Sequence, residues 1–383
     1  MIQKQWNPES IKDKLQLKAI QEKRPLSCTF ELTYRCNFNC RMCYIHMTDE
    51  QASKYGRLRT IDEWLDMARQ IREAGVLYLT LTGGECTRYP DFIKLYEQLS
   101  QMGFLITVMS NAGSYSEAIR DVFRRFPPHN VAITLYGGCN ETYLKVTGDR
   151  SGFDKTVDNI RFFKSIGIPV SLTFTMIKQN ALDYPLVGEL CNKLNQSFVL
   201  ITDITAHRYD SSLSEALSCR LSPAERVCVA LRPSSEVVIA INESNELEKK
   251  LVDFKLEFNQ DQKIETQMDY CIGSYSSCAI GWNGQMNNCL SLLGASCPDP
   301  FEIGFEAAWE ELIRNRSSVF KLPDECLMCQ MRSYCIRNCA GRRYEGTGST
   351  DKTDTYICQY TYLLNVLKNQ GYLTEFPAQP ECN

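Results

Sequence analysis

From about Leu26 to Ile204, short β-rich runs alternate with amphipathic helical stretches. This alternation is typical of parallel strands joined by crossover helices. Six such units fit either a partial barrel or a doubly wound open sheet, and both folds place active-site loops beyond the C-terminal ends of their strands. We expect the strands at Cys28–Thr33, Leu77–Thr82, Leu105–Ser110, Val131–Tyr136, Val170–Met176 and Phe198–Asp203.

The first helical stretch carries recognisable start and stop signals. Thr60 can cap it, with Glu63 three residues further on and an apolar face that includes Trp64 and Leu65. A glycine after the last apolar residue is a common helix terminator. Glycines are predicted to end this helix and two later ones, at Gly75, Gly103 and Gly167.

Directly after the first expected strand, a loop carries Cys36, Cys40 and Cys43. Thiolates are soft ligands that select iron–sulfur clusters or zinc. Three ligands on a four-iron cube leave one iron without a protein bond, and that iron can bind a small molecule, as an open position does at catalytic metal sites. A zinc site with a distant fourth ligand and three unconnected buried cysteines are the alternatives.

This C-x3-C-x2-C loop, followed by Tyr44, resembles the signature loop of the radical S-adenosylmethionine (SAM) superfamily. The resemblance implies an α/β fold, a partial (β/α)6 TIM-like barrel, in which the free iron chelates the methionine moiety of SAM. One electron then cleaves the sulfonium, and the resulting 5'-deoxyadenosyl radical abstracts hydrogen from substrate. Met42 departs from the family pattern, which usually has an aromatic residue there. A backbone contact to adenine survives this change, whereas a stacking contact does not.

Residues after later strands agree with this resemblance. Thr82, Gly83, Gly84 and Glu85 resemble the family's Gly-Gly-Glu segment, whose carbonyls and carboxylate take the methionine ammonium. Glycines let a backbone approach a ligand, and an acid complements a cation. Further residues stand where related enzymes hydrogen-bond the ribose and carboxylate of SAM, although capping or a satisfied turn is the alternative. These are Ser110, Asn111 and Thr134.

A second constellation of cysteines occupies the C-terminal third. It reads C-x12-G-x4-C, then C-x2-C-x5-C-x3-C, then one more cysteine after 18 intervening residues. This pattern resembles the SPASM extension of radical SAM enzymes, which carries two auxiliary four-iron clusters. Two zinc sites of the ribbon type would need the same seven thiols together with Cys278, which lies between the first two. The resemblance implies that Cys271, Cys278, Cys289 and Cys339 hold the first auxiliary cluster and that Cys326, Cys329, Cys335 and Cys358 hold the second, with Cys278 the least secure ligand.

These resemblances divide the chain into four parts. They are an N-terminal extension (1–25), a radical SAM partial barrel (26–207), a helical bridge (208–268) and a SPASM domain (269–383). Within the bridge, we expect the charged stretch Glu243–Lys255 to form a solvated helix.

The segment Tyr136–Tyr143 is similar to the corresponding segment of SPASM enzymes that modify ribosomally made peptides. We therefore expect the chain to crosslink or oxidise a peptide residue, with SAM and three four-iron clusters as cofactors. A SPASM dehydrogenase, similar to sulfatase-maturing enzymes or acting on a small molecule, and a non-enzymatic metal-binding scaffold are the alternatives. Cys86 and Cys139, after strands two and four, are candidates for donating hydrogen to a substrate radical.

The expected partners follow from the same resemblance. About 27 residues precede the first expected strand, so we do not expect a fused leader-recognition domain. A peptide substrate, a separate leader-recognition protein and a flavodoxin- or ferredoxin-type electron donor are expected instead.

Charge and hydropathy limit the remaining possibilities. The net charge is -4, with acids and bases mixed throughout, and nucleic-acid binders usually show a basic face. No apolar run approaches the roughly 18 to 20 residues that span a bilayer, and the start shows no signal-peptide core. We therefore expect a cytoplasmic protein without nucleic-acid or membrane partners. In such a reducing compartment, many of the 19 cysteines should bind metal or do chemistry.

Overall fold

The structure is a computed structural model that describes residues 10–252, 254, 271–295, 297–332, 335 and 339–370. Asp253 and Lys255 of the expected charged helix lie outside these residues. So do residues 1–9, 256–270, 296, 333–334, 336–338 and 371–383 of the predicted domains.

One sheet of eight strands organises the described residues, in the order β6-β5-β4-β3-β2-β1-β7-β8. The six predicted strands are parallel neighbours, so the predicted open, barrel-like α/β fold is confirmed. Two strands from the C-terminal third extend this sheet, because β7 pairs in parallel with β1 and β8 pairs antiparallel with β7. The strands are β1 (Ser27–Glu31), β2 (Tyr78–Thr82), β3 (Leu105–Ser110), β4 (Asn130–Leu135), β5 (Val170–Thr175), β6 (Phe198–Ile201), β7 (Ser277–Ile280) and β8 (Met286–Asn287).

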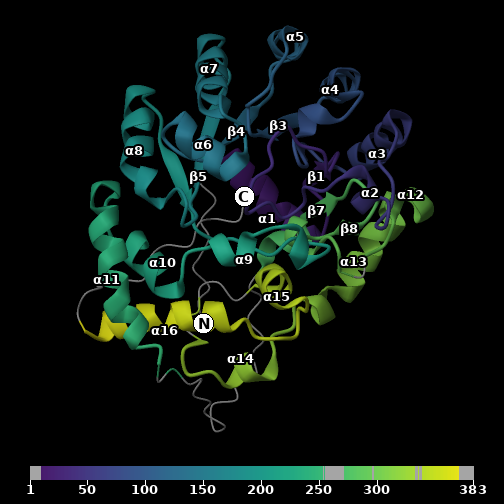
Figure 1. Ribbon diagram of the computed structural model, residues 1–383. Helices are drawn as coiled ribbons and strands as arrows, with labels where there is room; N and C mark the ends of the chain where they lie inside the picture. The colour runs from purple at the N-terminus through teal and green to yellow at the C-terminus, as the bar shows by residue number, and fades with distance from the viewer. Residues whose placement is uncertain are drawn as a thin grey trace.

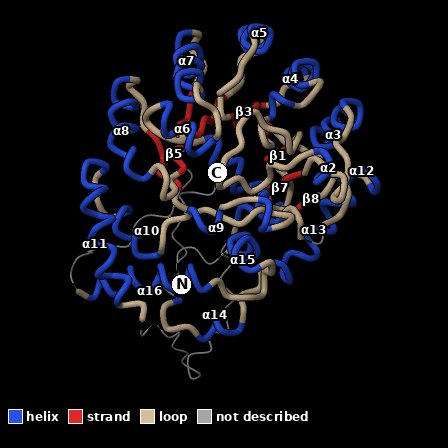
Figure 2. The backbone as a smooth tube through the Cα atoms, in the orientation of Figure 1, coloured by secondary structure: helices blue, strands red, loops and turns tan. Residues whose placement is uncertain are grey.

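Helices surround this sheet. Figure 1 shows α3, α4, α5, α7 and α8 in an arc outside the strands, and Figure 2 shows the strands enclosed by these helices. The helices up to the end of β6 are α1 (Ile11–Glu22), α2 (Asp49–Ala52), α3 (Ile61–Glu73), α4 (Phe92–Gln101), α5 (Glu117–Arg125), α6 (Asn140–Thr147), α7 (Gly152–Ser165) and α8 (Tyr184–Lys193). Those that follow are α9 (Ala216–Cys219), α10 (Pro223–Ala230), α11 (Val237–Lys249), α12 (Pro300–Ile303), α13 (Phe305–Val319), α14 (Asp324–Met328), α15 (Ala340–Thr347) and α16 (Thr355–Asn369).

The predicted helix signals operate as expected in α3. The Thr60 hydroxyl accepts a hydrogen bond from the Glu63 backbone N–H, and the Glu63 carboxylate accepts one from the Thr60 N–H. Gly75 follows the helix with φ of 99°, a conformation that a Cβ disfavours. Gly103 and Gly167 also have positive φ after α4 and α7, so the three predicted ends are confirmed.

A continuous apolar core lies between the sheet and its helices. Phe30 of β1 packs against Trp64 of α3, with ring centroids 4.6 Å apart. The same core reaches Phe305 on α13 and Tyr360 on α16. The C-terminal third therefore shares its core with the barrel.

The bridge differs from the predicted solvated helix. In place of Glu243–Lys255, the helix α11 begins at Val237 and ends at Lys249. It buries Val237, Ala240, Ser244 and Leu247, and it packs on α10. Its charged residues lie away from the buried face, with Glu243, Glu246 and Lys249 exposed.

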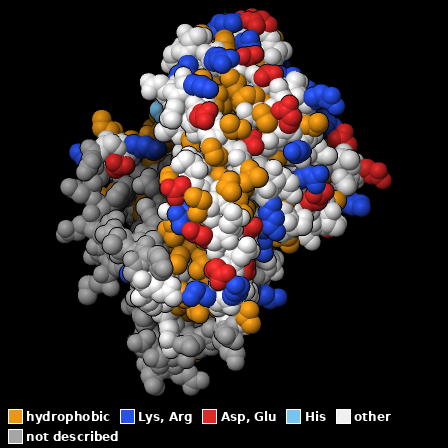
Figure 3. Space-filling model, turned by 60° about the vertical axis from the view of Figure 1, so that its left-hand side comes forward, with side chains coloured by type: hydrophobic (Ala, Val, Ile, Leu, Met, Phe, Trp, Pro, Cys, Tyr) orange, Lys and Arg blue, Asp and Glu red, His pale blue; other side chains and the backbone are white. Residues whose placement is uncertain are grey.

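Acidic and basic side chains are interspersed on the face of the molecule in Figure 3, as the mixed sequence predicts. In the part of the chain that the structure describes, no helix is both long enough and apolar enough to cross a bilayer.

Candidate functional site

The three N-terminal cysteines lie on the loop that follows β1. The loop is held to α6 by backbone hydrogen bonds, from Asn39 N to Thr147 O (2.8 Å) and from Arg41 N to Val146 O (3.0 Å). Burial, reinforced by the charges of the two neighbouring thiolates, raises the pKa of Cys40. The three thiols are thus close enough to repel one another when ionised.

Several donors point at these sulfur atoms. The backbone N–H of Phe38 lies 3.3 Å from Cys36 Sγ, and that of His46 lies 3.1 Å from Cys43 Sγ. The side-chain amide of Asn111 donates to Cys36 Sγ at 3.4 Å. Burial nevertheless raises the pKa of Cys36 to about 12. A cationic metal cluster would supply the compensating positive charge that these buried thiolates need.

The structure brings three predicted SAM-binding residues together at the ends of β2 and β3. The buried Glu85 carboxylate accepts hydrogen bonds from the Ser110 hydroxyl (2.8 Å) and the Asn111 backbone N–H (2.8 Å). Thr87 donates to its other oxygen at 2.8 Å. Burial raises the pKa of Glu85, although these donors oppose the shift. Through Asn111, this network reaches Cys36.

Gly83 and Gly84 pack against the backbone that leads into the cysteine loop. A Cβ on Gly83 would meet the Thr33 carbonyl oxygen at 2.4 Å, and one on Gly84 would meet the Arg35 carbonyl oxygen at 2.6 Å. Gly84 N and Glu85 N donate to these two carbonyls at 2.7 and 2.9 Å. The glycines therefore set the separation between the end of β2 and the cysteine loop.

The other predicted SAM-binding residues have different surroundings. Met42 is buried in a small apolar cluster with Ile177 and Ile204, which follow β5 and β6. Thr134 of β4 accepts a hydrogen bond from Thr173 Oγ1 at 3.3 Å. Thr82 is buried at the last position of β2.

An open cavity of about 470 Å³ adjoins the cysteine loop. It is lined by Cys36–Asn39 and His46 of the loop and by Thr147–Arg150 at the end of α6. This volume is within the range of small-molecule sites. Of the predicted SAM-binding and cluster residues, only Cys36 lines it.

A buried ion pair beneath the loop was not predicted from the sequence. Arg208 donates to both oxygens of Glu31, at 2.7 and 3.0 Å, and both side chains are almost completely buried. The Arg208 backbone N–H also donates to Tyr44 O at 2.8 Å. The pair therefore joins the end of β1, the cysteine loop and the segment after β6.

The two candidate hydrogen donors occupy different surroundings. Cys86 does not face an open site, because it is fully buried in the main core with Sγ 3.5 Å from Met109 O. Cys139 is half-buried at the N-cap of α6. Its Sγ lies 3.5 Å from Thr142 Oγ1 and 3.9 Å from Asp183 Oδ2.

The structure brings together three of the four cysteines predicted for the first auxiliary cluster. Burial raises the pKa of Cys289 to about 12, and the charges of Cys339 and Cys271 add to this shift. Cys278 lies elsewhere. It is buried in β7, opposite Cys28 of β1, and belongs to the main core.

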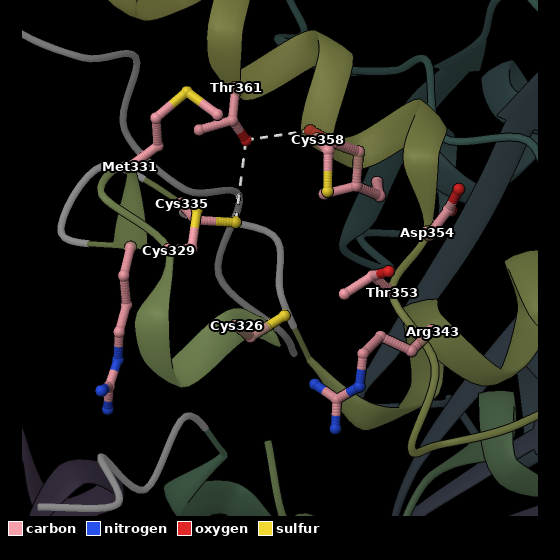
Figure 4. A pocket seen from close by; sticks show the side chains of 11 residues that line it. Cys326, Cys329, Met331, Cys335, Arg343, Thr353, Asp354, Cys358 and Thr361 are labelled. Carbon is pink, nitrogen blue, oxygen red and sulfur yellow. Dashed lines mark hydrogen bonds between the residues drawn. The ribbon is translucent and has the colours of Figure 1, made fainter. Parts of the chain in front are cut away.

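The four cysteines predicted for the second auxiliary cluster line one cavity. Figure 4 shows the sulfur atoms of Cys326, Cys335 and Cys358 directed into a common space, with the Arg343 guanidinium at its edge. Burial raises the pKa of Cys358 to about 12, and the charges of the other three cysteines, including Cys329, add to the shift. Four converging thiols of this kind fit a four-iron cluster.

No group of three Cys, His, Asp or Glu side chains within the described residues is arranged to hold a single metal ion. A four-iron cube presents a separate iron to each thiolate, so its ligand set differs from that of one ion.

Comparison with known proteins identifies the N-terminal part. Residues 30–184 match the radical SAM superfamily. This segment is a radical SAM domain. The family implies SAM and one four-iron cluster, which fit the cysteine loop and its sulfur-directed donors.

The radical SAM domain has relatives with known names. The sporulation killing factor maturation protein SkfB of Bacillus subtilis (strain 168) is 26% identical over 167 residues, which are 44% of this chain and 40% of that protein. A probable GTP 3',8-cyclase of Saccharolobus solfataricus is 29% identical over 159 residues, which are 41% of this chain and 50% of that protein. The matched segments thus span half or less of these relatives.

Solved structures resemble nearly the whole chain. Streptococcus suis SuiB, bound to its precursor peptide SuiA, aligns with a TM-score of 0.61 at 16% identity, covering 91% of this chain and 80% of that one. The anSMEcpe structure with bound AdoMet and Cp18Cys peptide aligns with a TM-score of 0.62 at 14% identity, covering 90% and 98%. These likenesses extend the shared fold into the C-terminal third.

Proposed function

We propose that this chain is a radical SAM enzyme that modifies a residue of a peptide and carries three four-iron clusters. The observation that carries the proposal is the hydrogen-bonded network from Glu85 through Asn111 to Cys36, which joins the predicted SAM-binding segment to the predicted cluster loop. This network lies within the radical SAM domain.

In this proposal, Cys36, Cys40 and Cys43 hold the first cluster, which supplies one electron for cleavage of the SAM sulfonium. Asn111 and the backbone donors of the loop stabilise the thiolates, because hydrogen bonds to sulfur offset their buried charge. Glu85 holds the ends of β2 and β3 in register for SAM and offers a negative charge to its ammonium. The other SAM contacts remain as predicted from the sequence, at Met42, Thr82, Gly83, Gly84, Ser110 and Thr134.

A peptide is the substrate class best supported by the comparisons. SkfB is named as a maturation protein, and SuiB was solved with a precursor peptide. The Cys326, Cys329, Cys335 and Cys358 group supports an auxiliary cluster that accepts the electron left after hydrogen abstraction. A separate leader-recognition protein, a flavodoxin- or ferredoxin-type donor and a reducing, cytoplasmic compartment complete the proposal.

The proposed enzyme activity can be tested by assaying anaerobically reconstituted protein for cleavage of SAM. We expect reduced protein with SAM to release 5'-deoxyadenosine, and the variant with Cys36, Cys40 and Cys43 all changed to Ala to release none while losing about four irons of about twelve. Cys228→Ala, a buried cysteine on α10, is the matched control. If the wild-type protein keeps its iron but releases no 5'-deoxyadenosine, the proposal that it is a radical SAM enzyme is wrong. If it binds zinc in place of iron, the result supports the non-enzymatic metal-binding scaffold.

The substrate class has its own test. Mass spectrometry of a candidate peptide encoded beside the gene, before and after reaction with reductant and SAM, should show a loss of hydrogen. A mass change only on small molecules would contradict a peptide substrate.

A further inference from the structure

The position of Cys278 sets it apart from the other cysteines predicted for the first auxiliary cluster. It pairs with Cys28 across the parallel β1 and β7 strands, and both thiols belong to the main core beneath the helices. Only 3% of Cys278 is exposed. Burial and the adjacent Cys278 raise the pKa of the Cys28 thiol, as expected for two thiols in apolar surroundings.

The strand register separates Cys278 from Cys289. In the antiparallel β7–β8 pair, Ala279 lies opposite Asn287 and Ile280 opposite Met286. Continuing this register places Ser277 opposite Cys289, which has extended backbone. Directly opposed residues share a face, and successive residues alternate between faces. Cys278 is therefore on the face opposite to Cys289.

An acidic side chain lies near Cys289 instead. The Oε2 atom of Glu345, on α15, is buried and has no hydrogen-bond partner among the described residues. Gly341, four residues before Glu345 on the same helix, faces Cys289, because a Cβ on Gly341 would lie 3.8 Å from Cys289 Sγ. Residues four apart on a helix share a face, so Glu345 lies on the side of α15 that faces Cys289. The helix that carries Glu345 begins directly after Cys339 and packs on the turn that follows Cys289.

We propose that the first auxiliary cluster of this chain is bound by three thiolates, those of Cys271, Cys289 and Cys339, with the Glu345 carboxylate as the fourth donor and Cys278 as a core residue. This inference rests on the proposed function, since it assumes that the first auxiliary cluster exists. It gives this cluster an oxygen-bound iron, which exchanges ligands more readily than a thiolate-bound one because thiolates are the preferred ligands of iron–sulfur clusters.

The first experiment counts iron and sulfide in anaerobically reconstituted full-length variants and records the electron paramagnetic resonance (EPR) spectra of their reduced clusters. Cys278→Val keeps the volume and apolar character of a core residue but cannot bind iron, so we expect wild-type iron and unchanged auxiliary signals. Cys271→Ala should lose about four irons of about twelve. Cys28→Val, at the paired core position, is the matched control.

The outcomes of this experiment separate the inference from the proposed function. If Cys278→Val loses about four irons while Cys28→Val keeps them, Cys278 is a ligand and the inference is overturned. If Cys271→Ala also keeps all its iron, the first auxiliary cluster is absent and the proposed cluster content fails instead.

The second experiment examines Glu345 in the variant that lacks Cys36, Cys40 and Cys43, so that the radical SAM cluster cannot contribute. We expect Glu345→Ala to change the EPR signal of the first auxiliary cluster and to bind ¹³C-labelled cyanide, detected as hyperfine coupling, more than tenfold better than the parent. Glu302→Gln, at an exposed position of α12, should match the parent. Equal cyanide binding and identical signals with and without Glu345 would refute the carboxylate donor.

Discussion

At the scale of single residues, the ion pair between Glu31 and Arg208 shows how the cysteine loop is supported. Glu31 is fully buried at the end of β1, and Arg208 stacks over the Tyr44 ring, 5.2 Å from its centroid. Removing one partner of a buried pair leaves an uncompensated charge in a low-dielectric environment. Breaking this pair should therefore lower the free energy of unfolding more than breaking an ion pair on the surface.

We predict that Glu31→Gln lowers the free energy of unfolding by about 3 to 5 kcal/mol. Replacing both partners, in Glu31→Leu with Arg208→Met, should recover part of this loss because no charge is then left unpaired. Glu215→Gln is the control, since Glu215 and Arg41 form an equally close pair with side chains 58% and 44% exposed, and its loss should cost less than about 1 kcal/mol. Urea unfolding measures all three, and equal losses for Glu31→Gln and Glu215→Gln would contradict the prediction.

The residues of the site differ in how far the sequence could predict them. Cys36, Cys40 and Cys43 were predictable because their spacing is local. Glu31 and Arg208 were not, because 177 residues separate them and neither has a diagnostic neighbour. The placement of Cys278 was also beyond the sequence, since it depends on the register between β1 and β7.

Gly84 gives a second prediction at this scale. A Cβ at this position would lie 2.5 and 2.6 Å from the carbonyl oxygens of Tyr34 and Arg35. A side chain here would therefore force the end of β2 away from the cysteine loop. We expect Gly84→Ala to cost about 1 to 3 kcal/mol of stability and to lower 5'-deoxyadenosine production.

Gly273→Ala is the matched control for Gly84, because a Cβ at Gly273 meets nothing within 4 Å. Thermal unfolding and product assays compare the two variants. If the two variants have the same melting temperature and the same rate of 5'-deoxyadenosine production, the close backbone approach at Gly84 contributes to neither stability nor activity.

At the scale of elements, local signals predicted the ends of α3, α4 and α7 better than the end of β6 or the position of α11. The Thr60–Glu63 capping box and the glycines after α3, α4 and α7 act within a few residues, so the sequence alone contains them. The strand β6 ends at Ile201, two residues before the predicted Asp203. Asp203 instead forms ion pairs with Arg226 of α10 and Arg342 of α15, contacts that only the tertiary structure brings about.

The capping box of α3 leads to a prediction about pH. The Arg57 guanidinium lowers the pKa of Glu63 from 4.5 to about 2. Because the folded-state pKa lies below the unfolded value, the stabilisation is complete above about pH 4.5 and is lost as the pH falls toward 2. Glu63→Gln should lower the melting temperature at pH 7, and the difference from wild type should shrink between pH 4.5 and 3.

The melting temperatures of the wild type and of Glu63→Gln are compared at each pH. Acid affects the clusters of both proteins equally, so this effect cancels in the difference. Asp62→Asn, in the same helical turn, is the control for charge near the helix N-terminus. A wild-type to Glu63→Gln difference that stays constant down to pH 3 would argue against the ion pair as its source.

At the scale of the whole molecule, the sheet crosses the predicted domain boundaries. The strand β7, from the C-terminal third, pairs along the edge of β1, the strand that leads into the cysteine loop. Arg59 also donates to Asp299 at 2.5 Å, and Arg208 donates to Leu290 O at 3.4 Å. The sequence predicted the two cysteine-rich regions separately, but it could not show that they share one sheet and one core.

This continuity predicts that the radical SAM domain depends on the C-terminal third. A chain of residues 1–268 would expose the edge of β1 and the apolar residues that pack on α13 and α16, and exposed strand edges promote aggregation. We expect this truncated chain to aggregate and to hold fewer than about four irons. The control is the full-length chain with Cys326, Cys329, Cys335 and Cys358 changed to Ser, because this variant loses a cluster but keeps β7. We expect it to remain monodisperse by size-exclusion chromatography and to retain the radical SAM cluster. A monodisperse 1–268 chain that cleaves SAM would show that the barrel folds without β7, and the shared sheet would then be a docking arrangement between two independent units.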